Sequence, residues 1–106
     1  MGLKVGMVKL EEYNMSFNVD LEKIGKVYGD EVLEQIKNNM DEVIKNINYM
    51  CQLNFDDVED IFERETLLFL YDNKTFVRKL NGLIKTLGIT YVDDIENDLS
   101  LLENLL

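Results

Sequence analysis

Apolar residues recur at steps of three and four from Leu21 to the end of the chain. This spacing places them on one stripe of a helix, whereas a half-buried strand needs apolar and polar residues to alternate. The stripe and its interruptions predict helices at 20–28, 30–38, from Asp41 to near Asn54, at 56–65 and from Asp72 to Gly88, with further helix from Thr90 onwards. We therefore predict an all-α fold of five to seven short helices.

The ends of these helices are assigned from glycine and from small polar residues. Gly29 and Gly88 can adopt the left-handed backbone that closes a helix. Acidic residues that follow a break can accept the free amide protons of the next helix. The candidate N-caps of this kind are Asp30, Asp41 and Asp72. Two pairs have the spacing of a capping box, namely Asp56 with Glu59 and Thr90 with Asp93.

Two segments do not show a clear helical period. The run from Leu67 to Tyr71 is wholly apolar, and we favour a buried helical turn over a strand because Asp72 then caps the next helix. Residues 1–19 have no single period, so a short helix and an extended packing arm both stay open. We expect a single helical domain over 1–106, with 1–19 as the arm or short helix and 20–106 as a repeat-like core.

The chain contains a candidate internal repeat with an offset of 34 residues. Val58-Glu59-Asp60-Ile61 returns as Val92-Asp93-Asp94-Ile95. The same offset relates Val43 to Val77, Met50 to Ile84, Leu53 to Leu87, Asn54 to Gly88 and Phe55 to Ile89. Each unit would be a short helix, a turn and a longer helix, stacked on its neighbour to bury the apolar face. Chance similarity among Leu-rich and Asp-rich helices is the alternative.

These units resemble the helical repeats of the mitochondrial transcription termination factor family and its bacterial relatives. Residues 57–64 look like the first helix, 67–71 like the apolar turn, and 75–88 like a second helix that closes on Leu-Gly; 92–102 look like the start of another copy. The likeness covers about 55–106, and 20–54 more loosely. It implies a small stack of helix-turn-helix repeats and, by analogy, nucleic-acid binding on a basic concave surface.

The chain departs from that family in two respects. It has no Pro, so the family's turn proline is missing. Of its 21 acidic and 11 basic side chains, twelve and five lie in 56–106, which gives this part a net charge of -7 out of a total of -10. Direct DNA or RNA binding needs a basic surface and is disfavoured. The surplus charge serves either solubility or an acidic face for a basic partner.

Composition removes most enzyme chemistry. The chain has no His, so Ser16, Ser100 and Cys51 lack the usual base. The glycines match no phosphate loop, and paired acids such as Asp93-Asp94 are typical of helix starts. We predict no catalytic, cofactor-binding or metal residues, and a buried structural role for Cys51. The basic residues form one local group, interpreted as surface ion pairs or as a small anion-binding surface: Arg64, Lys74, Arg78, Lys79 and Lys85.

The expected role is a non-enzymatic protein-interaction module or small accessory protein, of bacterial or phage type, without cofactors. A protein partner is expected on an apolar groove or on the acidic face, and the apolar Leu105-Leu106 end would suit a homodimer. The alternative is an acidic nucleic-acid mimic that occupies a basic cleft. No apolar run is long enough for a membrane helix, residues 1–10 do not resemble a secretory signal, and a single Cys suits the cytoplasm.

Overall fold

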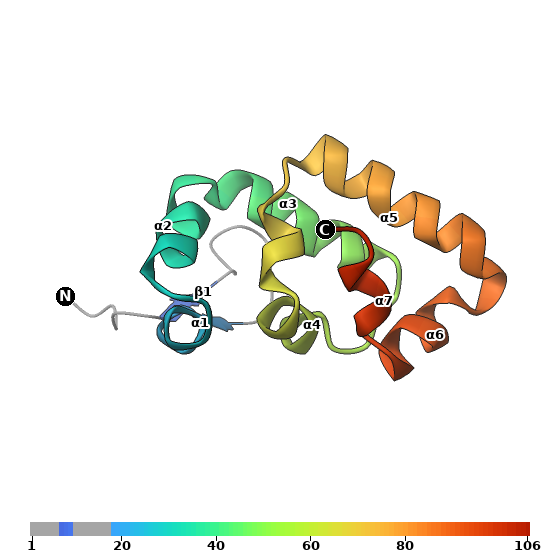
Figure 1. The fold of residues 1–106 in the computed structure, drawn as a ribbon, viewed down its shortest axis with the longest axis horizontal. Coiled ribbons are helices and arrows are strands. Elements are labelled where there is room, and N and C mark those ends of the chain that lie inside the picture. Colours follow the sequence, from blue (N-terminus) through green and yellow to red (C-terminus); the bar gives the residue numbers. More distant parts are fainter. Residues whose placement is uncertain (1–6, 10–17) are drawn as a thin grey trace.

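The computed structural model describes residues 7–9 and 18–106, which form a largely helical domain (Figure 1). A short antiparallel ribbon comes first, with Val8 opposite Val19. The elements are β1 (Met7–Lys9), β2 (Asn18–Asp20), α1 (Leu21–Tyr28), α2 (Asp30–Asn38), α3 (Met40–Gln52), α4 (Val58–Arg64), the 3₁₀ helix η2 (Thr66–Leu70), α5 (Asn73–Leu87), the 3₁₀ helix η3 (Gly88–Thr90), α6 (Tyr91–Asn97) and α7 (Ser100–Glu103). The predicted all-α class is confirmed.

The predictions for the N-terminal segment are only partly covered by the structure. Residues 7–9 and 18–20 are extended and pair with each other, β1 packing beside α1 and β2 beside α4. For residues 7–9 and 18–20, the structure therefore agrees with the extended arm rather than with the short helix, the two alternatives left open by the sequence. Residues 1–6 and 10–17 lie outside the described residues.

Several helix ends are where the sequence predicts them. Asp72 accepts hydrogen bonds from the backbone N of Thr75, at 3.2 Å, and from its hydroxyl, at 2.8 Å. These bonds lower the pKa of the Asp72 carboxyl. Gly29 and Gly88 have φ angles of 97° and 81°, where a side chain would be strained. The run at 67–71 is a helical turn, η2, with Leu68 and Phe69 buried.

The cap predicted from Asp56 and Glu59 is wrong by one residue. The side chain that caps α4 is Asp57, whose Oδ1 accepts from the backbone N of Asp60 at 3.0 Å. The backbone N of Asp56 donates instead to Glu96 Oε2, at 2.7 Å. Two adjacent aspartates offer the same acceptor, and only the backbone path decides which one faces the free N–H groups.

Two other predicted caps are also wrong, and Thr90, which does precede α6 as predicted, lacks the predicted side-chain bond. Asp30 and Asp41 lie inside the first turns of α2 and α3. A single residue links each of these helices to the helix before it, so Asp30 and Asp41 already have helical backbone. A negative side chain in the first turn of a helix interacts favourably with the helix dipole. Thr90 bonds the side chain of Asp94, at 2.9 Å, and not that of Asp93. As the last residue of η3 it has φ -94° and ψ 16°, far from the extended backbone of a capping residue.

The core contains three phenylalanines whose rings contact one another, one pair edge to face and the other tilted. Phe69, on η2, lies 5.2 Å from Phe62 of α4 and 5.1 Å from Phe76 of α5, measured between ring centroids. All three side chains are buried. Cys51 is only half-buried, and burial raises the pKa of its thiol.

Two polar residues of the described part of the chain are fully buried, Thr66 and Asn46. The amide of Asn46, on α3, donates to the carbonyl oxygens of Phe69, at 3.0 Å, and Tyr71, at 2.8 Å. Its own oxygen accepts from the side chain of Asn73 at 3.0 Å. Buried carbonyls need such donors. Asn46 therefore connects α3 to the η2–α5 junction.

The element order follows the candidate repeat. A short helix, a short helical element and a long helix occur as α1–α2–α3 and again as α4–η2–α5, and α6–α7 begin a third round. Shifted by 34 residues, α3 falls within α5, and the start of η2 falls on the start of α7. The corresponding long helices α3 and α5 pack together, and the short helices α1, α4 and α6 follow one another along one side of the molecule (Figure 1).

Candidate functional site

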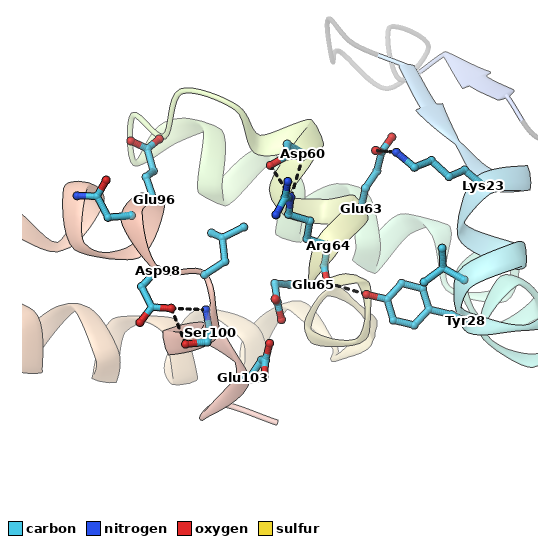
Figure 2. Close-up of a pocket in the computed structure, with 13 residues that line it drawn as sticks. Lys23, Tyr28, Asp60, Glu63, Arg64, Glu65, Glu96, Asp98, Ser100 and Glu103 are labelled. Carbon is cyan, nitrogen blue, oxygen red and sulfur yellow. Dashed lines mark hydrogen bonds and ion pairs between the residues drawn. The ribbon is translucent and has the colours of Figure 1, made fainter.

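A groove of about 740 Å³ runs past the three short helices that follow one another along the fold (Figure 2). Its lining comes from α1, from α4 and its C-cap, and from α6–α7, in the ranges 23–28, 60–65 and 96–103. The volume is within the roughly 300–1,000 Å³ of ligand pockets. The groove is therefore large enough for a small molecule or a piece of polypeptide.

The walls are connected by interactions between segments distant in sequence. The Tyr28 hydroxyl donates to the carbonyl oxygen of Arg64, at 2.6 Å, and Lys23 Nζ lies 3.1 Å from Glu63 Oε1, so that α1 is joined to α4. Glu96 joins α6 to the start of α4 through the backbone N of Asp56. These contacts fix the relative positions of the three helices.

The lining is strongly acidic. It contains two basic side chains, Lys23 and Arg64. It contains six carboxylates, Asp60, Glu63, Glu65, Glu96, Asp98 and Glu103, for a formal charge of -4. A smaller hollow of about 170 Å³ shares Asp60 and Glu96 with the groove and adds two more carboxylates, Asp56 and Asp57. The acidic surface thus continues towards the start of α4.

Both cations of the groove already have partners there. Lys23 pairs with Glu63, and Arg64 Nε lies 3.1 Å from Asp60 Oδ2. Asp98 accepts from the backbone N and the hydroxyl of Ser100, which are neutral donors. The negative potential is consequently concentrated on the α6–α7 side and at the end of α4.

Glu65 and Glu103 form a carboxyl pair inside the groove (Figure 2). Burial raises the pKa of Glu65 first, and the charge of Glu103 and a hydrogen bond with its carboxyl raise it further. Like charges at this distance disfavour the doubly ionised state. The pair joins the C-cap of α4 to α7, so its protonation affects how firmly α7 is held.

We expect Glu65→Gln to stabilise the protein near neutral pH. A carboxyl whose folded-state pKa is raised destabilises the folded state as pH rises through that pKa, and the cost disappears below the unfolded-state pKa. The melting temperature of the variant should therefore exceed that of the wild type at about pH 7, and the two should converge near about pH 3. Glu34→Gln, on the exposed side of α2, is the control. A shift that is the same at both pH values would contradict this expectation.

The structure separates most of the residues noted in the sequence. Arg64 lies in the groove, whereas Lys74, Arg78, Lys79 and Lys85 all belong to α5. Lys79 Nζ stands 5.0 Å from the centroid of the Tyr71 ring. Near the C-terminus, the Tyr71 hydroxyl donates to the carbonyl oxygens of Leu105 and Leu106, and the Leu106 side chain is half exposed.

The paired acids occupy helix starts in α4 and α6. Within residues 22–106, whose side chains the structure describes, no three Cys, Asp or Glu side chains are arranged to hold a metal ion. The sequence predicted an apolar groove or an acidic face for a partner, but not an acidic groove and not the residues that line it. The groove's one sequence signal is the repeat, which places 58–61 and 92–95 in equivalent positions.

Comparison with family models, curated proteins and solved structures gives no match for this chain. The resemblance to transcription termination factor repeats therefore stays a prediction. Of the helices in the described part of the chain, none has the length and apolar character required to cross a bilayer.

Proposed function

We propose that this chain is a non-enzymatic protein-interaction module and that its partner protein binds in the groove between α1, α4 and α6–α7. The observation that carries the proposal is the combination of an acidic hollow with an exposed apolar side chain in its lining. Val27 is 67% exposed, and the lining around it has a formal charge of -4. Apolar anchors surrounded by charged groups are typical of partner-binding surfaces.

The charge favours a different protein over a second copy of this chain. Each copy has a net charge of -10, so groove-to-groove contact would bring two acidic linings together at a cost in repulsion. A homodimer through Leu105-Leu106 would leave the groove open. The proposed partner is therefore heterologous.

The nucleic-acid-related alternatives receive less support from this geometry. A nucleic-acid mimic presents carboxylates on a protruding surface that enters a basic cleft, whereas here six of them line a hollow. Nucleic-acid binding by family analogy requires a basic concave face, and this lining is acidic. A mobility-shift titration at low ionic strength addresses the second alternative directly.

Val27→Arg should abolish partner binding, because it places a long cationic side chain in the groove. The matched control is Ile89→Arg, which changes an apolar residue that is 99% exposed and outside the groove lining. Affinity capture from the source cells, with the wild type and both variants at equal amounts, should give proteins retained by the wild type and Ile89→Arg but lost by Val27→Arg. Identical capture by all three proteins would refute the proposal.

A further inference from the structure

We propose that the groove binds a cationic, amphipathic segment of the partner protein, in which arginine side chains face the end of α4 and the α6–α7 segment while apolar side chains contact Val27 and Leu99. This inference rests on the proposed function and specifies the chemistry of its partner. The argument uses the uneven charge of the lining, the size of the groove and the position of its apolar residues.

The charge of the lining is not neutralised from within. Within the groove lining, the ion pairs join Lys23 to Glu63 and Arg64 to Asp60. Four groove carboxylates make no ion pair among the described residues: Glu65, Glu96, Asp98 and Glu103. An incoming cation can pair with these groups without breaking an ion pair of the described residues. Charge complementarity of this kind sets both specificity and the rate of encounter.

The arrangement of these carboxylates favours arginine over lysine. Glu65 and Glu103 come from different elements, yet their carboxyls lie within hydrogen-bonding reach of each other. A guanidinium group presents several N–H donors in one plane and can bridge two carboxylates, whereas an ammonium group acts as a point charge. Glu96 and Asp98 lie on the α6 side of the same groove (Figure 2), so a second cation along the segment would have partners there.

The size of the groove limits what can enter. About 740 Å³ accommodates a short piece of polypeptide and not a folded domain. Val27 and the half-buried Leu99 give the lining an apolar component. A segment with cationic and apolar residues on one face matches both features, as in helix-in-groove recognition.

The test uses the full chain and a labelled synthetic peptide of arginine and leucine at helical spacing, compared with the same peptide carrying neutral citrulline in place of arginine. Binding is followed by fluorescence anisotropy. We expect the citrulline peptide to bind at least about tenfold more weakly, and Glu65→Gln/Glu103→Gln to weaken arginine-peptide binding about five- to tenfold. The control Glu31→Gln/Glu34→Gln removes the same charge from exposed positions on α2 and should change binding less than about twofold.

Each outcome decides a separate point. Equal weakening by both double variants would show attraction to the overall charge only and would overturn the inference, as would equal binding of the citrulline peptide. A third outcome is that Val27→Arg loses the captured partner while Glu65→Gln/Glu103→Gln does not change the affinity for the arginine peptide. The proposed function would then stand, and the occupant of the groove would not be cationic. If the peptide requires Glu65 and Glu103 while Val27→Arg retains every captured protein, the groove binds cations but the proposed function fails.

Discussion

Phe69→Ala should lower the free energy of unfolding by about 3–5 kcal/mol, the usual range for removing a buried phenylalanine ring. The Phe69 side chain is completely buried and lies between Phe62 and Phe76, so its loss leaves a cavity where α4, η2 and α5 meet. Domains of this kind have a total stability of about 5–15 kcal/mol. Urea unfolding followed by circular dichroism will measure the difference.

Leu67→Ala is the matched control, because Leu67 belongs to the same 3₁₀ helix but is 40% exposed. It should cost only about 1 kcal/mol or less. Phe69→Leu fills part of the cavity and keeps the effect measurable if the alanine variant does not fold. Equal losses for Phe69→Ala and Leu67→Ala would show that the three contacting phenylalanines are not the centre of the core.

Asn46→Asp should be the second most damaging substitution at neutral pH. The new carboxylate has the shape of the amide but cannot donate to the carbonyl oxygens of Phe69 and Tyr71, which Asn46 serves now. Each buried carbonyl left without a donor costs about 1–3 kcal/mol, and the buried charge adds to this. We expect a loss of several kcal/mol at about pH 7 and partial recovery at about pH 4, where the carboxyl regains one donor.

Asn48→Asp makes the same chemical change on the exposed face of the same helix. It should alter stability by about 0.5 kcal/mol or less. The measurement is chemical unfolding of both variants at the two pH values. If Asn46→Asp were no worse than Asn48→Asp, or did not recover on acidification, the role assigned to the buried amide would be wrong.

The sequence was sufficient for features that depend on neighbouring residues. The helical class, the turn at 67–71, the Asp72 cap and the glycines at 29 and 88 all follow from local spacing and backbone preference. The cap of α4 did not, because Asp56 and Asp57 are chemically identical and only the course of the backbone distinguishes them.

Features that depend on tertiary arrangement were missed. The groove combines residues from 23–28, 60–65 and 96–103, and no local pattern brings these ranges together. Asn46 was also missed, although its position carried a signal. It lies three residues after Val43 and four before Met50, on the apolar stripe of α3. A polar residue at such a position has to find buried partners.

The buried amide also distinguishes the native arrangement from a misfolded one. A topology in which α3 and α5 exchange places would keep only part of the hydrophobic pattern. Val43 and Met50 correspond to Val77 and Ile84, but the buried Ile44 and Ile47 correspond to Arg78 and Asn81. Asn46 corresponds to the fully buried Leu80 at the 34-residue offset. Exchange would place an amide in apolar surroundings and leave the Phe69 and Tyr71 carbonyls facing a leucine. The buried amide thus adds to the differences between α3 and α5 that disfavour their exchange in a self-similar chain.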